Sequence, residues 1–195
     1  MSGNNTAQDI PQIPQLEAEL AREKHRRKYT RTLRSTVYSL IVVAAAAVLA
    51  ATVFFPVLQI FGGSMSPCVN EGEVVLAFKG SDFECGDVVA LWYGNKLLVK
   101  RVIAGSAQWV NIDAEGNVYV DGQYIDEPYI QNKAFGECNI RLPYQVPDGR
   151  YFVLGDYRSI SQDSRNTAVG CIAEEQIVGK IIFRIWPLNV IGKVE

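Results

Sequence analysis

Histidine is almost absent from this chain, and its scarcity limits the catalysis that the chain can perform. The one histidine, His25, lies in a basic stretch ahead of the longest apolar run. The four cysteines include no CxxC pair and have no histidine nearby, so their spacing does not resemble a zinc site. We therefore predict no metal and no cofactor. Any nucleophilic catalysis by this chain needs a base other than histidine.

Positive charge is scarce over most of the chain. Residues 1–34 carry seven basic and four acidic side chains, whereas residues 35–195 carry twelve basic and seventeen acidic ones. The net charges are therefore +3 and −5. An acidic C-terminal region gives no case for nucleic-acid binding. The polar, proline-containing residues 1–15 are typical of disorder, and residues 16–34 favour a charged helix.

One long apolar run decides the predicted architecture. Val37–Phe55 is nineteen residues without a charge, and about twenty apolar residues cross a hydrocarbon core. Seven Lys and Arg residues precede the run, and none follows until Lys79, so the positive-inside rule predicts a cytosolic N-terminus. A cleaved secretory signal is the alternative, but its apolar part is normally about 7–15 residues, and a long polar segment precedes this run.

We therefore predict a retained anchor in a single-pass protein of the plasma membrane, in contact with the lipid bilayer. The predicted parts are a cytosolic, basic and partly disordered tail over residues 1–34, a transmembrane anchor over residues 35–58, and an extracytoplasmic domain over residues 59–195.

The residues after the apolar run have the pattern of short strands separated by glycine turns. Gly94-Asn95 separates two apolar runs and predicts a hairpin, and no strong amphipathic helical period follows Leu58. The predicted fold class is mostly β, with one N-terminal transmembrane helix followed by an all-β domain large enough for its own core. The expected strands are residues 73–78, 87–93, 96–103, 109–112, 118–120, 123–125, 151–154 and 177–186.

A candidate catalytic pair lies close to the anchor. Ser64 begins the segment Ser-Met-Ser-Pro six residues after Leu58, and a serine nucleophile needs a base. His25 would lie across the membrane, so Lys100, in an apolar stretch, is the best remaining base, and Ser-Lys pairs are a known variant of the catalytic triad. An ordinary solvent-facing strand lysine is the alternative interpretation. Cys68 is a second candidate nucleophile, but nothing in the sequence supplies it with a base.

The cysteines leave the redox state open. An extracytoplasmic location permits disulfides, and four cysteines allow three pairings, but free thiols are an equal alternative. The residues concerned are Cys68, Cys85, Cys138 and Cys171.

Several segments together resemble the bacterial type I signal peptidases, the Ser-Lys enzymes of peptidase family S26. A lone Ser-Met-x-Pro would be weak evidence, but these segments occur in the family's order behind one anchor, and the resemblance extends from the anchor to the C-terminus. They are Gly62–Pro67 around the serine, Gly86–Val89, Lys100–Ala104 around the lysine, Gly155–Arg165, and Phe183–Leu188.

The resemblance implies a serine endopeptidase that removes N-terminal signal peptides from exported preproteins after a small residue, at the membrane surface. It makes Ser64 the nucleophile and Lys100, neutral at rest, the general base. It implies that Ser161 orients Lys100 and that Asp163 and Arg165 form a supporting ion pair. The residues expected to contact substrate are Gln59, Gly62, Met65, Leu97 and Val99.

The sequence departs from the family pattern at several places, among them Gly105–Ala107, where a Pro-Gly-Asp/Glu turn is usual. Tyr157 stands where asparagine is usual, and Cys68 where threonine is common. Gly62 stands where some members have a serine whose hydroxyl helps to bind the oxyanion. Two alternatives stay open: a specialised paralogue for pilin-like substrates, and a non-catalytic membrane-tethered module of the same fold. The presence of both Ser64 and Lys100 argues against the second.

Overall fold

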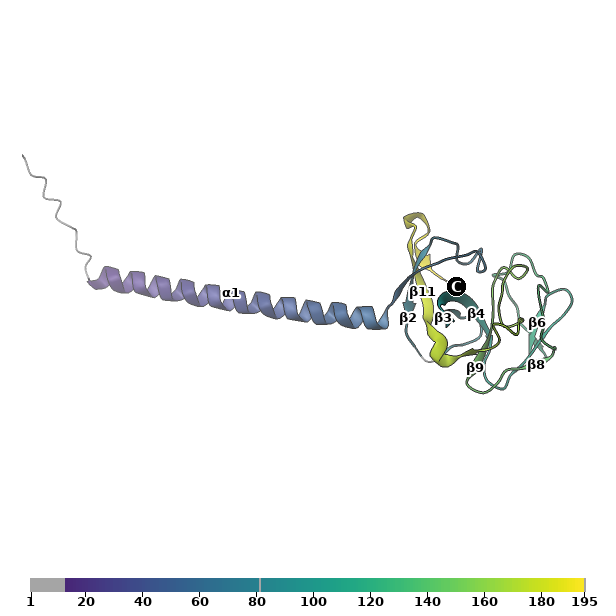
Figure 1. Cartoon of the computed structure of the whole chain (residues 1–195). Coiled ribbons are helices and arrows are strands. Elements are labelled where there is room, and N and C mark those ends of the chain that lie inside the picture. The colour runs from purple at the N-terminus through teal and green to yellow at the C-terminus, as the bar shows by residue number, and fades with distance from the viewer. Residues whose placement is uncertain (1–12, 81, 195) are drawn as a thin grey trace, which may run out of the picture. The chain divides into compact units, whose positions relative to one another are not determined.

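The computed structural model describes residues 13–80 and 82–194 (Figure 1). The chain divides into a helical unit that extends to Ala50 and a β unit that begins at Ala51. Each unit is described by itself.

The helix α1, Ile13–Phe54, has 42 residues and no buried side chain. Pro14 lies in its first turn, where a missing N–H costs no helical hydrogen bond. At about 1.5 Å per residue the helix is about 63 Å long. An 18-residue window in it has a mean hydropathy of 2.4, so α1 is long and apolar enough to cross a membrane.

The bounds of α1 differ from the expected ones at both ends. Residues 13–15 are helical, so the prediction of disorder is wrong for them, and residues 1–12 lie outside the described part of the chain. The helix ends at Phe54, before the end of the predicted anchor, and residues 57–59 already form a strand.

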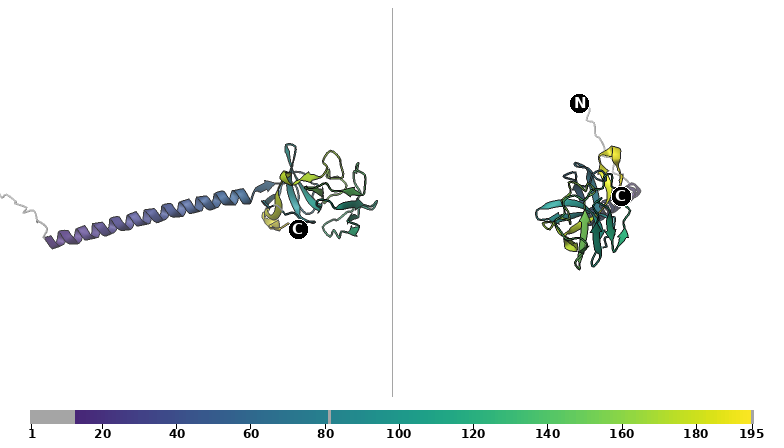
Figure 2. Two further views of the ribbon diagram at one scale, coloured as in Figure 1. Left: turned by 90° about the horizontal axis from the view of Figure 1, so that it is seen from below. Right: turned by 90° about the vertical axis from the view of Figure 1, so that its right-hand side faces the viewer.

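The β unit consists of two antiparallel sheets, so the predicted mostly β fold is confirmed (Figures 1 and 2). The larger sheet has the order β1-β2-β11-β3-β4-β9-β10, and β12 pairs with β11. Its strands are β1 Val57–Gln59, β2 Val74–Phe78, β3 Val88–Tyr93, β4 Lys96–Ala104, β9 Arg150–Leu154, β10 Ile172–Ala173, β11 Ile177–Trp186 and β12 Gly192–Lys193.

The smaller sheet has the order β7-β6-β5-β8. Its strands are β5 Trp109–Ile112, β6 Val118–Val120, β7 Gln123–Tyr124 and β8 Tyr144–Gln145. Two short 3₁₀ turns, Glu174–Gln176 and Leu188–Val190, flank β11. In Figure 1, β6 and β8 lie beside β9, on the far side of the β unit from β2 and β11.

All eight expected strands are present, and their ends differ from the expected ones by at most one residue. The strands β8, β10 and β12 were not expected, because two residues are too few to show an alternating pattern. The family resemblance implied a strand at residues 59–62, whereas β1 ends at Gln59.

One part of the hydrophobic core fixes the turn that carries Ser64. Met65 and Val69 in this turn are 1% and 0% exposed, and they pack with Val75 and Ala77 of β2 and with Val88 of β3. Because large side chains of the turn are buried against the larger sheet, the turn is held rigidly where β1 ends.

Candidate active site

Ser64 is half-buried in the turn between β1 and β2, and hydrogen bonds hold this turn from two sides. The main-chain N–H of Tyr157 donates to the carbonyl oxygen of Ser64 at 3.0 Å. Arg184 of β11 donates to the carbonyl oxygen of Cys68 at 2.5 Å. The main chain of the serine is therefore positioned from distant parts of the sequence.

Lys100 lies in β4 opposite Val89 of β3, and its residue is 2% exposed. Its Nζ atom is 2.8 Å from the Oγ atom of Ser64 and 3.0 Å from the Oγ atom of Ser161. The structure thus brings together the serine and the lysine that the sequence singled out, 36 residues apart. The solvent-facing alternative for Lys100 is wrong, since this side chain is buried.

Burial lowers the pKa of Lys100 from 10.5 to about 8, because an ammonium loses its hydration inside the protein. The charge of Asp163 raises this pKa, and the charge of Arg165 lowers it. Among residues 13–80 and 82–194, Lys100 forms no ion pair. With a pKa of about 8, roughly a tenth of the side chain is neutral at pH 7.

The segment after β9 carries Ser161, the second hydrogen-bond partner of Lys100. Asp163 and Arg165 form a buried ion pair, with Arg165 Nε donating to Asp163 Oδ1 at 2.8 Å. Asp163 Oδ2 also accepts the main-chain N–H of Gly155 at 3.1 Å. The expected ion pair is therefore present, and it braces the loop that places Ser161 against Lys100.

Gly155 is required at this point because the chain passes too close to the pair for a side chain. A Cβ atom there would lie 2.2 Å from Ser161 Oγ and 2.6 Å from the carbonyl oxygen of Ser64. Both distances are far below contact, so only glycine fits.

Arg101, the next residue in β4, has a different environment. It donates to both carboxylate oxygens of Asp156, at 2.9 and 2.7 Å, and to the carbonyl oxygen of Gly86 at 2.7 Å. Its guanidinium lies 3.7 Å from the centre of the Tyr129 ring. A third buried ion pair joins Arg158 to Glu127.

Sequence reasoning missed Glu127 and Tyr129. They lie in the irregular segment between β7 and β8, which carries no motif and no periodic pattern. The sequence holds no signal that pairs Glu127 with Arg158, because the two residues are 31 positions apart.

The residues expected to contact substrate have different surroundings. Leu97 and Val99 are half-buried in β4, Gln59 is exposed in β1, and Gly62 is exposed with φ at +85°. Met65 is 1% exposed and packs in the core, so little of it besides its main chain is accessible to a substrate. Its contact with substrate stays a prediction.

One edge of β4 is open beside Lys100. The strand β3 pairs with β4 from Lys96 to Arg101, whereas β9 pairs with β4 only from Arg101 onward. Among the described strands, none therefore pairs with residues 96–100 on the β9 side. An open strand edge can accept an extended peptide through main-chain hydrogen bonds.

The main-chain N–H of Ser64 is also available to donate a hydrogen bond to a substrate. It donates to no acceptor within the described ranges of the chain, and Gly62 contributes no hydroxyl near it. A free N–H at the nucleophile can stabilise an oxyanion that forms there.

Cys68 is a poor rival to Ser64. It is half-buried, and burial raises the pKa of its thiol, which disfavours the reactive thiolate. None of the four cysteines forms a disulfide with another described residue. Within residues 13–80 and 82–194, no three His, Cys, Asp or Glu side chains are grouped to hold a metal ion.

Comparisons with known proteins agree with this geometry. Residues 33–186 match the family described as signal peptidase, peptidase S26. A signal peptidase I of Bacillus licheniformis is 32% identical over 169 residues, which cover 80% of this chain and 89% of that protein. A signal peptidase IB of Staphylococcus aureus (strain Mu50 / ATCC 700699) is 37% identical over 150 residues, which cover 66% and 76%.

A crystal structure of a signal peptidase I from Enterococcus faecalis V583 aligns with a TM-score of 0.45 at 23% identity, over 52% of this chain and 98% of that one. This likeness is too slight to add to the comparison of sequences. The family match over most of the chain and the similarity to two bacterial relatives are decisive: this chain belongs to the signal peptidase family of serine peptidases, peptidase S26.

Proposed function

We propose that this protein is a membrane-anchored signal peptidase I in which Ser64 is the nucleophile and Lys100 is the general base. The 2.8 Å contact between Lys100 Nζ and Ser64 Oγ carries the proposal. The lowered pKa of Lys100, about 8, supports it because a base must be able to exist in its neutral form.

Acylation follows from this contact. Neutral Lys100 accepts the hydroxyl proton of Ser64 while Oγ attacks the carbonyl carbon of the scissile peptide bond. The carbonyl oxygen becomes an oxyanion, and the free N–H of Ser64 donates to it. When the intermediate collapses, the C–N bond breaks, and the ammonium of Lys100 gives its proton to the leaving amine. The products are an ester on Ser64 and a released amino terminus.

Deacylation uses the same base. Lys100 takes a proton from a water molecule, and the hydroxide oxygen attacks the ester carbon. The C–O bond to Ser64 breaks, and Lys100 returns the proton to Oγ. Ser161 Oγ, 3.0 Å from Lys100 Nζ, holds the amine in line through both steps.

The open edge of β4 supports recognition of an extended substrate segment upstream of the cut. Main-chain pairing along residues 96–100 would place the scissile bond near Lys100. Leu97 and Val99 border this edge and are half-buried, so little space beside them would favour small side chains before the cut.

Family membership and the apolar helix indicate a membrane-anchored protein. We propose that the N-terminus is cytosolic and that the β unit lies outside, since the basic residues precede the apolar run. Ser64 follows the end of α1 by ten residues, which span at most about 35 Å. Preproteins whose signal helix is still in the bilayer would therefore meet the serine at high effective concentration.

The test is cleavage of a preprotein by purified full-length protein in detergent. Cleavage should require Ala, Gly or Ser just before the cut and a small residue two positions earlier, and Ser64→Ala should remove it. Equal turnover of substrates with Phe or Ala just before the cut would reject the proposed specificity.

The topology has its own test. A reporter fused after the last residue should be active only outside the cytosol, and protease added to spheroplasts should digest the β unit. A cytosolic β unit would overturn the assignment, because exported substrates are processed on the outer face.

A further inference from the structure

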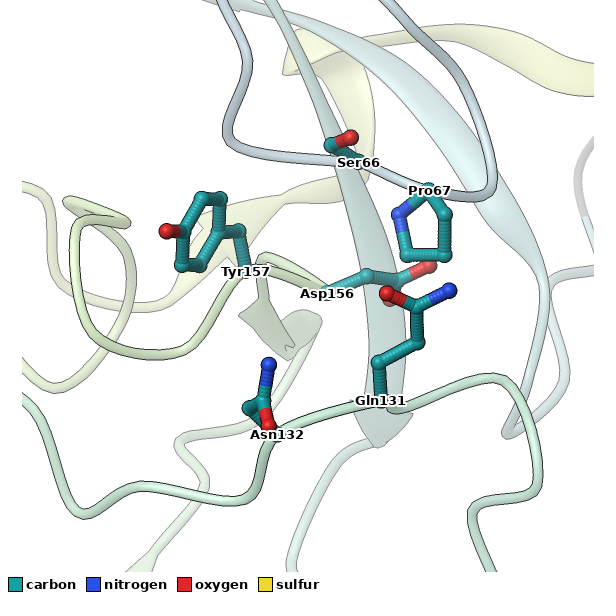
Figure 3. A pocket seen from close by; sticks show the side chains of 6 residues that line it. All are labelled: Ser66, Pro67, Gln131, Asn132, Asp156 and Tyr157. Carbon is teal, nitrogen blue, oxygen red and sulfur yellow. The ribbon is translucent and has the colours of Figure 1, made fainter.

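A polar cavity lies beside Ser64, and the mechanism above does not use it. Its volume is about 140 Å³. Figure 3 shows Ser66 and Pro67 on one side of it and two amide side chains on the other. The lining residues are Ser66, Pro67, Gln131, Asn132, Asp156 and Tyr157.

The strand register places this cavity beyond the reactive end of the open edge. Leu154 of β9 lies opposite Arg101, and the chain leaves the sheet at Gly155. A peptide on the open edge of β4 would take the place in the sheet that β9 leaves. Where it passes Lys100 it meets the segment that begins at Gly155, so the chain beyond the cut must turn outward there.

The cavity is within reach of the residues that follow the cut. Ser66 is two residues from Ser64, which is at most about 7 Å of chain. On the other wall, the main-chain N–H of Tyr157 binds the carbonyl oxygen of Ser64. Both walls are therefore fixed to the nucleophile, and the first two residues of the leaving segment can reach the space between them.

The segment that carries Gln131 and Asn132 is anchored by buried contacts. Glu127 pairs with Arg158, and the hydroxyl of Tyr129 donates to Glu127 Oε1 at 3.0 Å. The ring of Tyr129 lies under Arg101, which follows Lys100 in β4. This wall is thus tied to the strand that carries the catalytic lysine.

The chemistry of the lining favours an uncharged polar group. The carboxylate of Asp156 is matched by Arg101, so the buried wall carries no unpaired charge. Within residues 13–80 and 82–194, the side-chain amides of Gln131 and Asn132 hydrogen-bond to nothing. Each amide offers both donors and an acceptor.

We propose that this cavity is a subsite for the leaving segment, which takes the side chain of one of the first two residues after the cut and prefers an uncharged hydrogen-bonding side chain to an apolar one. The inference rests on the proposed function. Gln131 and Asn132 determine the preference, and Ser66 borders the entrance.

The experiment compares preprotein substrates that differ only at the first or the second position after the cut. Purified full-length protein in detergent is given the Gln and Leu versions, which have similar size, and kcat/KM is measured for each. At one of the two positions the Gln version should be cleaved about fivefold faster, the difference that one hydrogen bond makes. In Gln131→Leu combined with Asn132→Leu this ratio should fall to about one.

A matched control is Gln123→Leu, an exposed position in β7 that does not line the cavity, and it should leave the Gln-to-Leu ratio unchanged. The preference for Ala over Phe before the cut should persist in every variant. A wild-type ratio of one at both positions, or a ratio that survives the double substitution, overturns the subsite and leaves the proposed function standing. Failure to cleave any preprotein overturns both.

Discussion

Lys100 and Arg101 are adjacent, equally buried and both basic, yet they have opposite environments. Arg101 is 1% exposed and is paired through two hydrogen bonds with Asp156. Lys100 is 2% exposed, and within the described part of the chain its Nζ atom hydrogen-bonds only to the hydroxyls of Ser64 and Ser161. Successive side chains of a strand point to opposite faces, so one strand serves two environments.

This difference separates a structural cation from a reactive one. A buried cation that has a carboxylate partner stays charged and holds the fold together. A buried cation whose neighbours are hydroxyls loses hydration without compensation, so its pKa falls and the neutral base becomes accessible. The predictions below test this contrast.

The largest expected effect is loss of catalysis when either member of the pair is removed. Ser64→Ala and Lys100→Met should each lower kcat/KM for a preprotein by at least about 10⁴-fold, and the double variant should be hardly worse, because the two residues act as one unit. Lys100→Arg should be equally inactive, since a guanidinium stays protonated. An active Lys100→Arg protein would show that the proton goes elsewhere.

The same substitution at the neighbouring position should act on stability. Arg101→Met leaves the carboxylate of Asp156 buried without a partner, which should lower the free energy of unfolding by about 3–5 kcal/mol. Lys100→Met removes an amine that has no ion partner among the described residues, and it should change the free energy of unfolding by less than about 1 kcal/mol. Urea unfolding of the full-length protein in detergent, followed by tryptophan fluorescence, measures both. Equal losses would remove the distinction between the two cations.

Ser161→Ala tests whether the second hydroxyl orients the amine. Loss of its contact with Lys100 Nζ should lower kcat by about 10- to 100-fold and leave KM nearly unchanged, because the lysine is misplaced and the substrate edge is intact. Single-turnover cleavage separates the two parameters. A purely structural role would instead lower stability and leave kcat as it was.

The pH dependence follows from the pKa of Lys100. Only the neutral amine accepts a proton, so activity should rise as pH increases through about 8, by about tenfold between pH 7 and pH 9. A kcat/KM profile for a preprotein in detergent measures this. An ascending limb near 10.5, the ordinary value for lysine, would mean that burial does not tune the base.

The smallest effect is expected at Tyr157. Its contact with Ser64 is made by the main-chain N–H, and its side chain is 43% exposed, so Tyr157→Asn should change kcat by less than about tenfold. With that exposure the side chain also contributes little to packing. A loss close to that of Ser64→Ala would assign the side chain a direct role.

The sequence by itself determined eight of the described strands and the apolar helix. Alternating apolar residues, glycine turns and a long uncharged run are local patterns, and local patterns can be read without knowing what packs against them. The segments around Ser64 and Lys100 were identifiable because the chemistry of that pair constrains residues next to each other in the chain. The ion pair of Asp163 with Arg165 was expected from the resemblance to the signal peptidases and not from a local pattern.

Only the tertiary structure decided that Lys100 is buried, that Met65 packs inward, and that Glu127 pairs with Arg158. These facts depend on segments that meet across 30 or more residues, and a pairing of that kind leaves no periodic trace in the sequence. The cavity beside Ser64 has the same origin, since its walls come from three separate segments. Burial and charge pairing are properties of the assembled surface of several strands, and for that reason the difference between Lys100 and Arg101 exists only in the folded protein.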